Sequence, residues 1–231
     1  MRRAAAALIA VIALLVAIGL VRAQPPGCQQ GEFALSCTTY APVVIVPPPT
    51  RTSSPTPAPP TPTPVPPPLS AIVLQPADVS SDYLIDEFRE FKNDEAAKGY
   101  ANPKAALVAF AQQGRESSWI ARYFSAFDNP LGISDQGIRY LTEAGADAGL
   151  EYVIADVRAD HPDAAPFSFS VGDRTVALSW GFISNGHAYN EYYYAIRKGR
   201  YITLVWVIGY QADLTVSIAN VFARKSEARL P

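Results

Sequence analysis

The chain has 231 residues, and its 19 Lys and Arg against 21 Asp and Glu give a formal net charge of -2 at pH 7. This length predicts one or two domains, and the near-neutral balance offers no basic field to hold nucleic acid, so we expect no nucleic-acid partner. Two Cys and two His exclude a disulfide-dense scaffold and a Cys-based zinc finger.

The N-terminus has the pattern of an export signal. Arg2 and Arg3 precede an apolar run from Ala4 to Val21, and Ala23 ends the stretch. A charged start, an apolar run and a small-residue cleavage site are typical of a secretory signal peptide, so we predict removal of residues 1–23. The alternative is an uncleaved membrane anchor, because such a run reaches the lower limit for spanning a bilayer. The chain would then touch the membrane only through this segment.

Residues 24–41 form a short segment that contains both cysteines. Export places the chain outside the cytoplasm, where disulfides persist. We therefore expect Cys28 and Cys37 to form a local disulfide that closes a small loop. The predicted location is extracytoplasmic, with the protein either secreted or anchored at the cell envelope.

Residues 42–69 are predicted to be a disordered Pro/Thr-rich linker. Thirteen of the 27 residues from Pro42 to Pro68 are proline. Proline fixes φ and lacks an N–H group, so the segment favours extended polyproline conformation over a helix or a central strand. It could span about 80 Å, and we interpret it as a spacer.

Residues 70–231 are predicted to be one globular domain. They hold all three Trp, eleven of the twelve Tyr and nine of the ten Phe, and the segment is long enough for one buried core. Fifteen basic and twenty acidic side chains give it a charge of about -5.

The first part of this domain predicts a helix and a hairpin. Asn102 before Pro103 is a good helix start, and Gly114 ends that helix. Residues 118–127 and 132–141 carry β-branched and aromatic residues, and the turn residues between them predict a hairpin.

The second part predicts a helix, three strands and a closing helix. Thr142 caps a helix that runs to about Arg158, and Asp213 is predicted to cap the last helix. Strands are expected at 173–184, 187–197 and 201–210, and part of 78–92 favours a strand. The predicted class is α+β: a mostly antiparallel sheet of five or six strands with about three helices on one face.

The hairpin around Gly199 decides which residues share a face of the sheet. A two-residue turn at Lys198-Gly199 would place Glu191 on the core face, which is costly for a carboxylate. We therefore expect a bulged turn with Gly199 in the left-handed conformation, which shifts the register by one residue. The core face would then carry Tyr192, Tyr194, Ile196, Ile202, Leu204, Trp206 and Ile208.

The opposite face is the candidate site. In this register three Tyr rings surround one carboxylate on a face that no predicted helix covers, a pattern that can bind sugars, peptides or apolar ligands. An ordinary amphipathic strand face would show the same residues. The candidate binding residues are Tyr189, Glu191, Tyr193, Tyr201 and Thr203.

Other chemistry-bearing groups give weaker patterns. His187 follows the turn pair Asn185-Gly186, and we interpret it as a surface or cap histidine because no nucleophile motif accompanies it. Asp156, Asp160, His161 and Asp163 do not have the spacing of an EF-hand loop, and no phosphate-binding loop, H-E-x-x-H or C-x-x-C motif occurs. We expect no metal, no cofactor and no catalytic residue.

The layout of signal, Pro/Thr spacer and α+β domain resembles a group of uncharacterised exported, lipoprotein-like bacterial proteins. The residues that carry the resemblance are Gln75-Pro76-Ala77-Asp78, the hairpin tip Arg197-Lys198-Gly199 and a closing helix from Ala223 to Leu230. The resemblance implies a sheet-and-helix domain and no particular activity.

Three functions fit these observations. The first is a non-catalytic extracytoplasmic binding or sensing module, displayed on the spacer, whose ligand or partner belongs to the envelope or the extracellular space. The second is a hydrolase of cell-wall or extracellular polymer that uses Glu191 with a second carboxylate. The third is an envelope assembly component that buries its aromatic face against a protein.

Overall fold

The computed structural model describes residues 65–125 and 130–231. The predicted signal or anchor (1–23), the segment of Cys28 and Cys37 (24–41) and most of the predicted linker (42–69) lie outside these residues. In the part that is described, no helix combines the length and apolarity needed to cross a bilayer.

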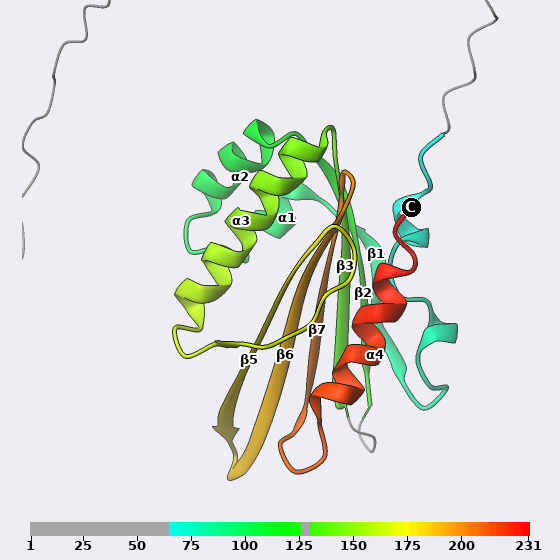
Figure 1. Ribbon diagram of the computed structural model, residues 1–231, viewed down its shortest axis with the longest axis vertical. Helices are drawn as coiled ribbons and strands as arrows, with labels where there is room; N and C mark the ends of the chain where they lie inside the picture. The colour runs from blue at the N-terminus through cyan, green and yellow to red at the C-terminus, as the bar shows by residue number, and fades with distance from the viewer. Residues whose placement is uncertain (1–64, 126–129) are drawn as a thin grey trace, which may run out of the picture. The chain divides into compact units, whose positions relative to one another are not determined.

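The described residues form one antiparallel sheet with helices packed against it (Figure 1). The strand order is β1-β2-β3-β7-β6-β5-β4. The strands are β1 (Leu84–Phe91), β2 (Arg115–Phe124), β3 (Gly132–Tyr140), β4 (Ala165–Pro166), β5 (Arg174–Ser184), β6 (His187–Lys198) and β7 (Tyr201–Tyr210). The helices are α1 (Asn93–Ala97), α2 (Pro103–Gln112), α3 (Glu143–Asp160) and α4 (Val216–Glu227).

This architecture confirms the α+β class and the predicted order of the main elements. The described residues contain seven strands and four α-helices, more than the five or six strands and three helices expected. The additions are short: α1 has five residues and β4 has two. Neither is long enough to produce a periodic sequence pattern.

Side-chain caps fix the starts of the longer helices. The Asn102 side chain accepts a hydrogen bond from the Ala105 N–H at 3.1 Å, and the Thr142 hydroxyl accepts one from the Gly145 N–H at 3.0 Å. For α4 the predicted cap was wrong. Thr215, not Asp213, precedes the first turn, and its hydroxyl accepts from the Ile218 N–H.

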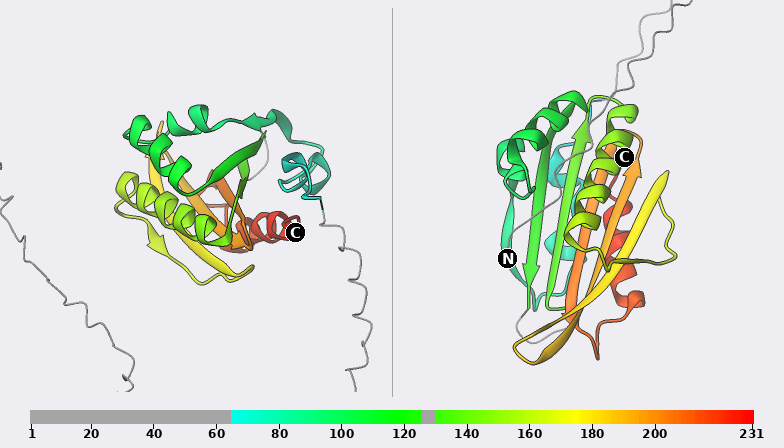
Figure 2. Two further views of the ribbon diagram at one scale, coloured as in Figure 1. Left: turned by 90° about the horizontal axis from the view of Figure 1, so that it is seen from above. Right: turned by 90° about the vertical axis from the view of Figure 1, so that its left-hand side faces the viewer.

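Helices cover both faces of the sheet, which corrects the prediction of helices on one face. Helix α3 packs on the face that carries Leu178, Tyr193 and Ile202, here called the α3 face. Helix α4 packs on the face that carries Tyr194 and Val207, here called the α4 face. Figure 2 shows α3 in front of the sheet and α4 behind it. Each helix buries one apolar stripe, and the sheet buries both of its faces.

The register of the β6–β7 hairpin also differs from the prediction. Lys198 pairs with Tyr201, so Gly199 and Arg200 form a two-residue turn, and Gly199 has φ +55°. This register places Glu191 on the same face as Ile202, Trp206 and the α3 helix. The carboxylate is 7% exposed and lies on the core side, where the cost of burial led us not to expect it.

Candidate functional site

Helix α3 covers only part of its face. It ends at Asp160, and β5, β6 and β7 run on past that end of the helix (Figure 1). Two cross-strand rows at this end of the α3 face differ in exposure: Trp180 and Glu191 are buried, whereas Phe182 is 37% exposed. The residues in these rows are Trp180, Glu191 and Ile208, then Phe182, Tyr189 and Tyr210, with Trp206 at the margin of the helix-covered part.

Glu191 lies between the part of this face that α3 covers and its exposed end. The indoles of Trp180 and Trp206 and the ring of His161 act on its carboxylate and favour the charged form. Burial raises the pKa of Glu191 above its usual value, because desolvation outweighs the opposing effects of the two indoles and of His161. The two indoles therefore offset part of the free-energy cost of burying Glu191. That cost was the reason for predicting the other register.

Two cavities meet at Glu191 and Trp206. The first, of about 260 Å³, extends toward β1 and β2 and is lined by Asp86, Arg122, Phe124 and Ile208. The second, of about 380 Å³, extends toward β5 and is lined by His161, Asp163, Trp180 and Phe182. We call the two together the Glu191 groove. Apolar walls around a few convergent polar groups are typical of ligand sites.

Aromatic rings line the groove. The Trp206 side chain is 39% exposed, and its ring lies 5.9 Å from the ring of Trp180. His161, the residue that follows α3, stacks on the ring of Trp180, with 4.0 Å between the two ring centroids. At the open end, Tyr189 stacks between Phe182 and Tyr210, at 5.0 and 5.2 Å. Such rings supply rigid contact surface at little entropic cost.

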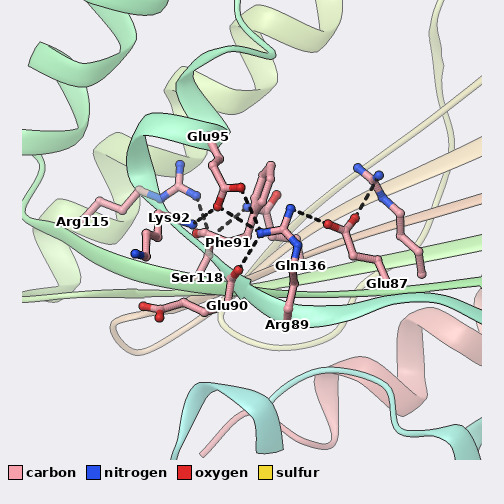
Figure 3. A network of polar contacts seen from close by, with 10 residues as sticks. Glu87, Arg89, Glu90, Phe91, Lys92, Glu95, Arg115, Ser118 and Gln136 are labelled. Atoms are coloured by element: carbon pink, nitrogen blue, oxygen red, sulfur yellow. Dashed lines mark hydrogen bonds and ion pairs between the residues drawn. The ribbon is translucent and has the colours of Figure 1, made fainter.

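The basic groups at the β1 side of the groove are already paired. Arg122 forms an ion pair with Glu87 at 3.0 Å, and Arg89 pairs with both Glu87 and Glu95. Figure 3 shows Arg89 between the two carboxylates. Arg122 thus lines the first cavity, and its charge is compensated by Glu87 on β1 and not by Glu191.

The structure brings together three of the five predicted site residues. Tyr189, Glu191 and Tyr193 lie on the α3 face, with Tyr193 buried under α3 and Tyr189 half-buried against Phe182 at the end of the groove. Tyr201 and Thr203 lie on the α4 face, so the predicted five-residue face does not exist. The cause is the hairpin register, since a one-residue slip moves a strand's side chains to the other face.

Thr203 belongs to a buried polar network under α4. Its hydroxyl donates to the Asp135 carboxylate at 2.5 Å and lies 2.6 Å from the Ser226 hydroxyl. The other Asp135 oxygen accepts from the Leu74 N–H at 2.7 Å. Tyr201 packs nearby with Ile72 and Leu230. These residues tie the chain before β1, the sheet and α4 together, which is a structural role.

The two histidines have different surroundings. His187 is exposed at the start of β6, with its ring 5.7 Å from that of Tyr210. His161 belongs to the groove through its stacking on Trp180. Over residues 65–125 and 130–231, no group of three or more His, Cys, Asp or Glu side chains is arranged to hold a metal ion.

Sequence reasoning missed Trp180, Trp206 and His161. The register assigned Trp206 to the core, while His161 was considered only as part of an acidic loop. The sequence did contain a usable signal, because side chains alternate between the two faces along a strand. With a two-residue turn between β6 and β7, Trp180 and Trp206 lie on the same face as Glu191. An indole N–H is a ready donor for a carboxylate that is only partly hydrated.

The chain has a distant structural similarity to a known protein domain. No family model matches the chain. No curated protein matches it either. Among solved structures, the chain is similar to the extracellular domain of PknH from Mycobacterium tuberculosis, with 13% sequence identity and a TM-score of 0.47. The match covers 69% of this chain and 95% of that domain. The expected resemblance to exported bacterial proteins remains a prediction.

Proposed function

We propose that the protein is an exported, non-catalytic binding or sensing module that takes its ligand in the Glu191 groove. In this proposal the signal or anchor (1–23) directs export, and the Pro/Thr-rich segment (42–69) displays the domain 70–231. The observation that carries the proposal is the open groove itself. It has exposed aromatic rings around a buried carboxylate, on a face that α3 covers only in part.

The functional test is ligand binding that depends on Trp206. We expect the full-length protein to bind at least one of three probes, triacetylchitotriose, a blocked neutral tripeptide or a blocked basic tripeptide, in ligand-detected NMR. Trp206→Ala should weaken that binding roughly tenfold, because a buried aromatic contact at the centre of a site contributes more than 1 kcal/mol. Binding that survives Trp206→Ala unchanged, or the absence of binding by all three probes, would contradict the proposal.

The matched control is Val221→Ala. Val221 is 47% exposed on α4, on the other side of the sheet. Its truncation should leave the affinity for the same probe within twofold, since exposed substitutions away from the site change little.

The hydrolase alternative rests on a second observation. Asp86 lines the same cavity as Glu191, whose pKa is raised by burial, and glycosidases use two carboxylates on either side of the reacting bond. A preparation that hydrolyses a cell-wall polymer and loses turnover on Glu191→Gln would favour this function over simple binding. The third candidate, envelope assembly, predicts instead that the groove is occupied by a folded protein partner.

A further inference from the structure

Glu191 is a buried carboxylate that lacks a cationic partner among the described residues. No Lys or Arg in that part of the chain lies within ion-pair distance of it, and the groups that favour its charged form are the neutral indoles of Trp180 and Trp206 and the ring of His161. His161 stacks on Trp180 and forms no ion pair there. A carboxylate withdrawn from water without an ion-pair partner is costly, and a bound cation would offset that cost.

The other charges around the groove also favour a cation. Asp86 lines the first cavity and Asp163 the second, so carboxylates lie on both sides of Glu191. Arg122, which lines the first cavity, is paired with Glu87. An anionic ligand would face this excess of negative charge, whereas a cationic ligand complements it.

The surroundings of Glu191 suit an organic cation better than a metal ion. The acidic and histidine side chains of the described region form no metal-binding group, as noted above. The walls beside the carboxylate are instead the ring of Trp206, the side chain of Ile208 and the ring of Phe182. An apolar stem can lie along such walls while its charge interacts with a carboxylate and with aromatic faces.

The edge of the sheet favours a peptide as the carrier of that cation. Strand β4 pairs with β5 only at Leu178 and Ser179, so residues 180–184 of β5 have no neighbouring strand on their outer side among the described residues. The second cavity runs from Gly181 and Phe182 on this edge to Glu191. An extended peptide can hydrogen-bond to a free strand edge and send alternate side chains into a pocket.

We infer that the Glu191 groove binds a basic peptide, with a Lys or Arg side chain that passes over Phe182 and Trp206 and forms an ion pair with Glu191. This inference rests on the proposed function, because it names the ligand class of the same groove. The peptide backbone lies along the β5 edge, and the basic side chain enters the second cavity.

The test compares two blocked tripeptides that differ in one charge. Acetyl-Ala-Lys-Ala-amide and its norleucine counterpart have stems of similar shape, and only the first carries an ammonium group. By calorimetric titration of the full-length protein, we expect the lysine peptide to bind at least tenfold more tightly. Glu191→Gln should remove most of that difference and leave the affinity for the norleucine peptide within twofold.

Control measurements separate the possible failures. Glu143→Gln, an exposed carboxylate in the first turn of α3, should leave both affinities unchanged. Should Glu191→Gln fail to fold, the salt dependence of the unmodified protein decides: added salt should weaken binding of the lysine peptide only.

Equal affinities of the two peptides, with the norleucine peptide still sensitive to Trp206→Ala, would overturn the cation inference and keep the groove as a site. Binding of neither peptide would overturn the inference, and the proposed function would then depend on the saccharide probe.

Discussion

Replacing Asp135 with alanine is expected to lower the free energy of unfolding by about 2–4 kcal/mol. The Asp135 side chain is fully buried, and its oxygens accept hydrogen bonds from the Leu74 N–H and the Thr203 hydroxyl. Alanine would leave the Leu74 N–H without a partner in the core and would open a cavity between β3, β7 and α4. Chemical denaturation followed by circular dichroism measures the loss.

Asp213→Ala is the control for this experiment. Asp213 is exposed in the turn before α4, and its side chain forms no hydrogen bond or ion pair with the described residues. Its replacement should change stability by no more than about 0.5 kcal/mol. A similarly small effect of Asp135→Ala would show that the network contributes little to the fold.

The pH dependence of stability gives a separate prediction for Asp135. Burial raises its pKa from 3.8 to about 6, since desolvation outweighs the hydrogen bonds from Thr203 and Leu74. The folded state therefore prefers the protonated carboxyl, and this contribution is fully present below pH 3.8 and is lost as the pH rises through about 6. Asparagine does not titrate.

The stability advantage of the natural protein over Asp135→Asn should therefore narrow between pH 4 and pH 7. A pKa difference of this size corresponds to about 3 kcal/mol. Denaturation curves of the two proteins at several pH values provide the measurement. Parallel stability profiles would mean that Asp135 does not change its protonation state in the folded protein.

Gly149→Ala is the second substitution with a large expected effect, and its sign is opposite to the usual one. In an exposed helix this change stabilises by about 1 kcal/mol. At position 149 a Cβ atom would lie 2.2 Å from the Tyr140 hydroxyl oxygen and 2.4 Å from its Cζ, and the Tyr140 ring is 1% exposed. Because the ring has no space to move, we expect a net loss of about 1–3 kcal/mol in thermal or chemical unfolding.

Ala148→Gly is the matched control on the same helix. Ala148 is exposed, so its change to glycine should cost only the helix propensity, about 1 kcal/mol. A stabilising effect of Gly149→Ala would imply that α3 lies farther from the sheet than described. The placement of α3 matters for function, because α3 determines which part of its face stays open.

The sequence predicted the individual helices and strands well, but it did not predict which face of the sheet each helix covers. Caps and turn residues located the helices, as Asn102 and Thr142 illustrate, because these signals act within a few residues. Periodicity shows that a helix has an apolar stripe but not which side of the sheet receives it. Helix α4 has such a stripe, and nothing local indicates that it packs opposite α3.

Only part of the candidate site could be predicted, because local signals do not show which strands pair in which register. Glu191 and Tyr189 were identified, while Tyr201 and Thr203 were included because the register was chosen to keep a carboxylate out of the core. That argument treated burial of Glu191 as uncompensated. The compensating groups are Trp180 on β5 and Trp206 on β7, and a single strand's sequence does not reveal them.

Asp135 shows what alternation could have revealed. Ile133 and Asp135 are two residues apart in β3 and therefore lie on one face, and Ile133 is buried. This spacing predicts a buried carboxylate. Its partners could not be predicted, because Leu74 and Thr203 lie 61 and 68 residues away in the chain.

The most direct test of the Glu191 groove uses the three tryptophans of the chain as reporters. Their indole N–H groups give three signals in a nitrogen–proton correlation spectrum of the full-length protein. Trp180 and Trp206 line the groove, whereas Trp119 packs against the core on the α4 face. Titration with acetyl-Ala-Lys-Ala-amide should shift the Trp180 and Trp206 signals and leave that of Trp119 in place. Shifts confined to Trp119, or no shift of any indole signal at saturating peptide, would contradict binding in the groove.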